Sequence, residues 1–177
     1  PRPATDVETI TGAGIVGTVD GAPARLGKPT WLPPGSLAAD VTRLQELEDA
    51  RRIIDAAEKK AIEIGQPMNI AVVDEGANLI SHIRMDKAWI GSINIAINKA
   101  FTARAFNIST KELADNSQPG DQFYGIHVSN HDRVMIFAGG IPLKDQNGVV
   151  IGAIGVSGGS GVQDQTVAEA GAAAHTC

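Results

Sequence analysis

Two hairpin patterns in the body of this 177-residue sequence dictate the kind of sheet that it can form. Residues 69–85, NIAVVDEGANLISHIRM, turn at 75–78, and residues 134–157 turn at Asp145-Gln146-Asn147-Gly148. An Asn-Gly pair between two apolar runs is a strong hairpin signal, because both residues tolerate the backbone of a tight turn. Strands joined by short turns are antiparallel. We therefore expect one antiparallel sheet built from two hairpins.

Helical patterns surround the two hairpins. Residues 41–64 repeat apolar side chains at three- and four-residue steps, and Gly65 and Pro67 follow as stop signals. Thr42 and Gln45 have the spacing of a capping box near the start of this helix. Further helices are expected over 88–106, after a capping-box signature at 109–112, and over 162–174. Helices beside an antiparallel sheet indicate an α+β fold.

The first 40 residues differ in composition from the rest of the chain. Residues 1–40 are rich in Gly, Pro and Thr, and we interpret them as an extended arm with short strands at most and one hairpin around Asp20-Gly21. Residues 41–177 are expected to form a single domain without internal repeats. Its longest irregular stretch is 116–132, and long ordered loops on a compact scaffold often carry function.

Charge and composition exclude several classes of protein. The formal net charge is −5 with no block of basic residues, which argues against a nucleic-acid partner. No apolar run approaches the roughly 20 residues of a transmembrane helix. The single cysteine, Cys177, has no partner for an internal disulfide. The chain begins PRPATD without Met, which leaves a removed secretory signal and a trimmed chain as alternative expectations.

The stretch GAIGVSGGSG at 152–161 looks at first like a phosphate-binding loop. A Walker loop requires a Lys that neutralises the phosphates, and no Lys follows Lys144. A dinucleotide fingerprint starting at Gly159 would need a third glycine where the chain has Asp164. We therefore expect the glycines to permit close packing, with Asp164 in the first turn of the last helix, where its charge suits the helix dipole.

Five runs in order carry a resemblance to a known family: MNIAVVDEGANLISHIRMD (68–86), GSINIAINKAFTARAF (91–106), QPGDQFYGI (118–126), IFAGGIPL (136–143) and VIGAIGVSGGSG (150–161). Over about residues 42–174 the chain resembles the GlcG/HbpS family of haem-degrading domains, which includes the C-terminal domain of PduO proteins. It is most similar to the secreted actinobacterial branch. One departure is Asn94, where the family often has an acidic residue.

This resemblance implies a profilin-like sheet and a function. We expect an extracellular protein that binds haem and iron, assembles as a homo-oligomer, with an octamer suggested, and acts as an accessory regulator of a membrane sensor histidine kinase. Enzymatic activity is left open, and would be at most slow haem degradation. Two alternatives remain: an enzyme of the same fold that binds a small metabolite, and a structural assembly partner.

Haem requires an apolar slot and usually a ligand to its iron. His127 and Tyr124 are the preferred candidates because they lie in the irregular 116–132 stretch, and Thr110 could offer a weaker hydroxyl ligand. The alternative for each is a surface, hydrogen-bonding or helix-capping role. The remaining candidates for the ligand are His82, His131 and Met85. The aromatic content of only 4% argues for a shallow site, or one shared between subunits.

The basic candidates for pairing with haem propionates are Arg84, Lys99 and Arg104, and the alternative is a salt bridge that includes Asp86. For iron itself, Asp55 and Glu58 lie one turn apart on the first helix, off its apolar stripe. Two carboxylates at this spacing can bind a hard cation, although a solvated helix face has the same pattern. No HExxH zinc motif occurs in the sequence.

Overall fold

The computed structural model describes residues 5–10, 14–19, 22–27 and 38–175. The chain divides into two compact units, 1–45 and 46–177. The first carries a three-stranded antiparallel sheet made of β1 (Thr5–Ile10), β2 (Gly14–Val19) and β3 (Ala22–Gly27). The expected turn residues Asp20 and Gly21 lie outside the described residues. The strands on either side pair as a hairpin, Val19 with Ala22.

The second unit is built on a four-stranded sheet with the strand order β5-β4-β7-β6. Its strands are β4 (Asn69–Val73), β5 (Leu79–Arg84), β6 (Gly140–Lys144) and β7 (Val150–Ser157). β4 and β5 form one hairpin, β6 and β7 form the other, and antiparallel pairing of β4 with β7 joins them. The predicted α+β fold, with two hairpins in one antiparallel sheet, is confirmed.

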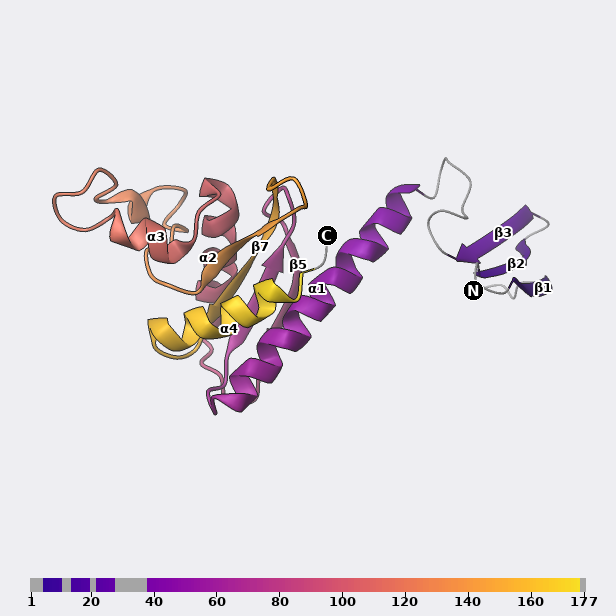
Figure 1. Ribbon diagram of the computed structural model, residues 1–177, viewed down its shortest axis with the longest axis horizontal. Helices are drawn as coiled ribbons and strands as arrows, with labels where there is room; N and C mark the ends of the chain where they lie inside the picture. Colours follow the sequence, from indigo (N-terminus) through magenta and orange to yellow (C-terminus); the bar gives the residue numbers. More distant parts are fainter. Residues whose placement is uncertain (1–4, 11–13, 20–21, 28–37, 176–177) are drawn as a thin grey trace. The chain divides into compact units, whose positions relative to one another are not determined.

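Helices cover both faces of this sheet (Figure 1). α1 (Ala38–Glu63) and α4 (Gly161–Ala173) pack on one face, where apolar side chains of α1, β4, β7 and α4 form the larger core cluster. α2 (Ser92–Phe106) covers the opposite face, and its alanines pack against β4 and β7. Every residue of β4 is buried because this strand is covered on both faces.

One strand is shorter than the sequence suggested. The second hairpin was expected from residue 134, but β6 begins only at Gly140. The backbone N–H of Met135 donates instead to the hydroxyl of Thr102 at 2.9 Å, and Gly139 has a φ of +119°. A positive φ interrupts the extended conformation of a strand. The apolar character of this run reflects burial of a connecting segment, since Val134 is 1% exposed.

The start of α1 also differs from the expectation. The helix begins at Ala38, so Thr42 lies inside it and the predicted capping box of Thr42 and Gln45 is wrong. Ala38 and Ala39 are strong helix formers and extend the helix toward the N-terminus. Its end is as predicted, because Gly65 follows with a φ of +68°.

The glycines of the 152–161 stretch permit close packing, as the sequence suggested. A Cβ added at Gly155 would lie 2.1 Å from the carbonyl oxygen of Ala96 and 2.4 Å from the nitrogen of Ala100. A Cβ at Gly152 would lie 2.6 Å from the carbonyl oxygen of Val73. Helix α2 therefore rests directly on the backbone of β7, an approach that only glycine allows.

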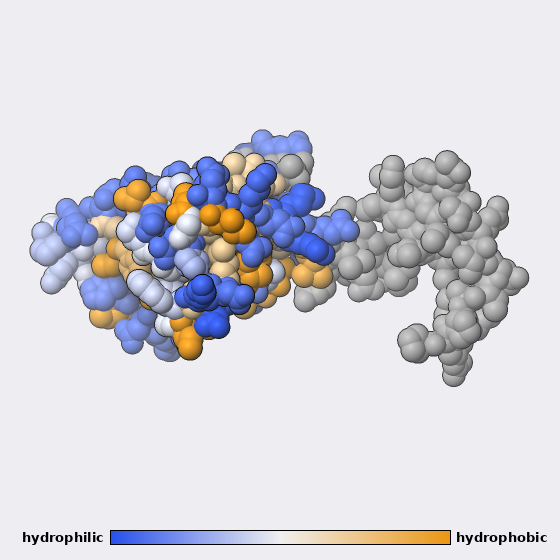
Figure 2. Space-filling model, turned by 90° about the horizontal axis from the view of Figure 1, so that it is seen from below, coloured by the Kyte–Doolittle hydropathy of each residue, from blue (hydrophilic) through white to orange (hydrophobic). Residues whose placement is uncertain are grey.

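The surface of the second unit is mixed. On the face in Figure 2, apolar side chains form small separate patches between polar side chains. None of the helices in the described part of the chain is both long enough and apolar enough to cross a membrane. Ligand or partner sites on this face are therefore to be sought in local patches.

Candidate functional site

The irregular stretch 116–132 is held in an ordered series of turns after α3 (Thr110–Asp115). The N–H of Phe123 donates to the carbonyl oxygen of Asn116 at 3.1 Å, and the N–H of Ile126 donates to that of Phe123 at 2.9 Å. A short 3-10 helix, η2 (Ile126–Val128), follows Gly125, whose φ is +87°. The stretch therefore forms a defined surface on which side chains are presented.

Aromatic and apolar side chains of this loop face solvent. The exposed fractions are 38% for Phe123, 66% for Tyr124 and 66% for Val128, and His127 is exposed within η2. Exposed apolar side chains that cluster on a surface mark contacts with a ligand or partner. The phenol of Tyr124 and the imidazole of His127 are thus both available at one short, partly apolar surface segment.

A hollow of about 380 Å³ borders the same loop. Its apolar wall comes from the last residue of α2, from the α2–α3 connection, from α3 and from the loop: Phe106, Ile108, Leu113, Phe123 and Ile126. Polar side chains complete it: Glu112, Asn116 and Gln122. An apolar hollow with a few polar groups is the usual form of a small-molecule site.

Arg84 lies at the opposite end of α2 from this hollow. Its Nη1 donates to the carbonyl oxygen of Ala88 at 3.3 Å, just before α2 begins, whereas Phe106 at the other end lines the hollow. A helix of this length spans about 20 Å. One copy of the chain therefore does not bring Arg84 together with Tyr124 and His127.

Lys99 is completely buried in the middle of α2. Its ammonium donates to Oδ2 of Asp164 at 2.7 Å and to the carbonyl oxygen of Val156 at 2.9 Å. It also lies 4.4 Å from the ring centroid of Phe137, a cation–π contact. The salt bridge considered as the alternative for Lys99 is therefore present, but its partner is Asp164, and the ammonium does not face solvent.

Asp164 completes this buried cluster from the first turn of α4. Its Oδ1 accepts hydrogen bonds from the N–H groups of Gly158 at 3.1 Å and Gly159 at 2.9 Å. Burial raises the pKa of Asp164, and the neighbouring Lys99 partly offsets this. Burial likewise lowers the pKa of Lys99, against the attraction of Asp164. The cluster thus ties the glycine turn and α4 to α2.

Thr110 is also buried, and its Oγ1 accepts the N–H of Gly140 at 2.8 Å. The cap of α3 is the neighbouring Ser109, whose Oγ accepts the N–H of Glu112 at 3.1 Å, as the sequence indicated. In this position the hydroxyl of Thr110 joins α3 to the start of β6. An iron ligand role would require this contact to open.

Asp55 and Glu58 lie on α1, one turn apart. The side chain of Asp55 is 67% exposed, with Nε of Arg51 at 4.0 Å, while Glu58 is half-buried. Among the described residues, no group of three or more His, Cys, Asp or Glu side chains could hold a metal ion. At this position on α1, one copy therefore offers two side chains to a hard cation, which prefers six or more oxygen ligands.

The other candidates for the iron ligand occupy different settings. His82 lies on β5, where its Nε2 is buried without a hydrogen-bond partner and burial lowers its pKa. Met85 is half-buried, and its sulfur accepts the N–H of Met68 at 3.3 Å. His131 is exposed with a φ of +58°. Of the histidines in the 116–132 loop, only His127 lies within the run of exposed apolar side chains.

A family model described as haem-degrading protein, HbpS-like, matches residues 46–173. The chain belongs to this family. The match lies within the second structural unit, 46–177, and confirms the resemblance found in the five sequence runs.

Individual relatives agree with this assignment. An uncharacterized 15.0 kDa protein of Citrobacter freundii, from the dhaT-dhaS intergenic region, is 45% identical over 123 residues, which cover 70% of this chain and 86% of that protein. The solved structure of a PduOC–haem complex is 35% identical with a TM-score of 0.69, covering 72% and 91% of the two chains. A double mutant of HbpS from Streptomyces reticuli is 31% identical with a TM-score of 0.64, covering 86% and 95%.

Proposed function

We propose that this protein binds haem at a shallow surface site formed by the 116–132 loop and the hollow beside it. The observation that carries the proposal is that Phe123, Tyr124 and Val128 are exposed in the same short segment as the exposed His127. The haem complex of the relative PduOC, which has the same fold, supports a haem ligand for this chain.

The chemistry of the loop suits a porphyrin. The flat apolar face of the porphyrin can pack on the side chains of the hollow. A neutral imidazole is a common ligand of haem iron. His127 is the preferred ligand and Tyr124 is the second, as a phenolate. Bound haem would supply a redox-active iron, and the loop residues would hold it at the surface.

The propionates need cations that the hollow does not supply. No Lys or Arg is among the side chains that line it, and Arg84 lies at the far end of α2. Arg104 lies in the last turn of α2, near the hollow, but its Nη1 donates to Oδ1 of Asn107 at 2.8 Å. A second copy of the chain could bring basic side chains to the haem edge. We therefore propose that the site is shared between subunits of a homo-oligomer, and the family resemblance suggests an octamer.

The proposal has three further parts, supported by the family resemblance and, for iron, by the one-turn spacing of two carboxylates on α1. Asp55 and Glu58 bind iron, the protein acts outside the cell, and it serves as an accessory to a membrane sensor histidine kinase. Cross-linking in intact producing cells tests the last two parts, since it should recover such a kinase together with this protein. Recovery of the protein from the cytosolic fraction alone would contradict them.

Titration of the full chain with haemin tests the proposed function. Absorbance should show a shifted Soret band that saturates at a fixed ratio of haem to chain at micromolar protein. Light scattering should show an oligomer whose mass is a multiple of the chain mass. Absence of saturation, or a shift no larger than that given by an unrelated acidic protein, would refute haem binding.

A further inference from the structure

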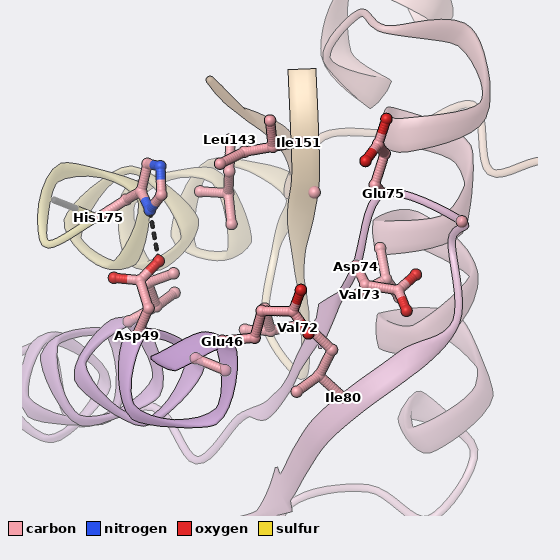
Figure 3. A pocket seen from close by; sticks show the side chains of 14 residues that line it. Glu46, Asp49, Val72, Val73, Asp74, Glu75, Ile80, Leu143, Ile151 and His175 are labelled. Atoms are coloured by element: carbon pink, nitrogen blue, oxygen red, sulfur yellow. Dashed lines mark hydrogen bonds and ion pairs between the residues drawn. The ribbon is translucent and has the colours of Figure 1, made fainter. Parts of the chain in front are cut away.

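A second cavity of about 360 Å³ lies on the face of the sheet that α1 covers (Figure 3). None of the residues that line it belongs to the 116–132 loop. It is bounded by α1, by the end of β4 and its turn, by residues of β5, β6 and β7, and by the segment that follows α4. Its floor is apolar and includes the buried side chains of Ile53, Val72 and Leu143. This part of the molecule can therefore accept an apolar body.

Four carboxylates stand around this apolar floor. Glu46 and Asp49 come from α1, and Asp74 and Glu75 come from the turn after β4, across the cavity in Figure 3. No Lys or Arg is among the side chains that line the cavity. Acidic side chains therefore outnumber basic ones around an apolar surface.

Two of these carboxylates have partners within the protein. Oδ2 of Asp49 lies 2.6 Å from Nδ1 of His175, and its Oδ1 is paired with Arg52. The carboxylate of Asp74 accepts the backbone N–H of Asn78 at 2.8 Å. The Asp49–His175 contact, drawn as a dashed line in Figure 3, fixes the segment after α4 against α1 and closes one side of the cavity.

Glu46 and Glu75 make no hydrogen bond or ion pair with any described residue. They are exposed side chains at the mouth of the cavity, on opposite elements. The negative charges around the cavity repel each other, and a bound cation would offset this repulsion. Both carboxylates are thus available to a ligand.

We propose that this cavity binds a small organic cation with an apolar body, such as a protonated aliphatic amine. The apolar part would displace water from Ile53, Val72 and Leu143, and the ammonium would lie between Glu46 and Glu75. The apolar floor, which offers no ligand to a metal, and the absence of any metal-binding group of three side chains in the described part of the chain favour an organic cation over a metal ion. The anionic propionates of haem would be repelled here, so the cavity is distinct from the proposed haem site.

Calorimetric titration with n-hexylammonium tests the proposal, with 1-hexanol and hexanoate as probes of equal length. The ammonium should bind saturably, the alcohol roughly fivefold or more weakly, and hexanoate not measurably. Glu46→Gln and Glu75→Gln should each weaken the ammonium roughly threefold to fivefold. Asp115→Asn removes the same charge outside the cavity and should leave the affinity unchanged.

A second variant keeps the test sharp. Ile151 lines the cavity and is 37% exposed, so Ile151→Lys places a cation at the mouth without disturbing the buried core. It should abolish binding of hexylammonium, whereas Ile151→Gln should retain it, with circular dichroism unchanged in both. Equal binding of the alcohol and the ammonium, or unchanged affinity in the Glu variants, would overturn the proposal. Haemin titration of Glu46→Gln/Glu75→Gln should match that of the parent chain, so each proposal can fail independently.

Discussion

The Nζ of Lys99 lies 2.7 Å from Oδ2 of Asp164, and the two side chains are only 0% and 3% exposed. The pair joins the middle of α2 to the first turn of α4, on opposite sides of the sheet region that carries the glycine stretch. Burial opposes the charge on both groups, so each ion is tolerated only because the other is present. This relationship gives the first prediction.

Removing either member of the pair should be strongly destabilising. Lys99→Met and Asp164→Asn should each lower the free energy of unfolding by about 3–5 kcal/mol, because an uncompensated charge or unpaired polar group remains buried. The double variant should lose at least about 1 kcal/mol less than the sum of the two single losses. Urea unfolding of all four proteins measures this coupling, and strictly additive losses would contradict it.

The close packing of α2 on β7 predicts a clear difference between two glycines. Gly155→Ala should lower the free energy of unfolding by about 2–3 kcal/mol, because its Cβ would collide with the backbone of Ala96 and Ala100. Gly161→Ala is the matched control. The added Cβ would have the Cβ of Ala138 as its nearest neighbour, at 3.8 Å, which is ordinary van der Waals contact. Its effect should stay within about 1 kcal/mol. Thermal unfolding compares the two, and equal losses would refute the packing argument.

Burial of His82 predicts an acid-sensitive stability. Its folded pKa lies below the ordinary value of 6.5, so between these two values the unfolded chain binds more protons than the folded one. The contribution of His82 is therefore fully present above pH 6.5 and is lost as the pH falls through that window. His82→Gln should flatten this part of the curve, whereas His131→Asn, which changes an exposed histidine, should not. Urea midpoints between about pH 7 and pH 5 measure it, and identical slopes in all three proteins would speak against it.

Much of the fold follows from the sequence, because turns and periodicity are local signals. The Asn-Gly turn and the alternation of hairpins with helices sufficed to predict the antiparallel sheet. The start of β6 could not be predicted in this way, since the burial of Val134 and the bond from Met135 to Thr102 depend on where α2 packs.

The site was less predictable for the same physical reason. The sequence suggested Lys99 as a propionate partner, and only the fold reveals that Asp164, 65 residues further along, reaches its ammonium. Likewise, His175 lies near the end of the chain, yet its side chain is only 8% exposed and contacts Asp49 on α1. Pairings between distant segments leave no spacing pattern in a single sequence. The loop signal at Tyr124 and His127 was local, and both residues are exposed as a surface site requires.

The two carboxylates proposed for iron give a further prediction. Asp55→Asn combined with Glu58→Gln should reduce the ferric iron retained per chain after dialysis roughly tenfold or more, because a hard cation loses both of its oxygen ligands. Glu63→Gln on the same helix, where Glu63 is paired with Lys60 at 2.7 Å, is the control and should retain iron. Equal retention by all three proteins would place the iron elsewhere.

The central claim is that haem binds through the 116–132 loop, and a matched pair of histidine variants tests it most directly. His127→Ala and His131→Asn each remove one exposed imidazole from the same segment. In haemin titrations followed at the Soret band, we predict that His127→Ala loses or shifts the saturable band of the parent chain, while His131→Asn reproduces it. A parent-like spectrum and affinity in His127→Ala would contradict the account.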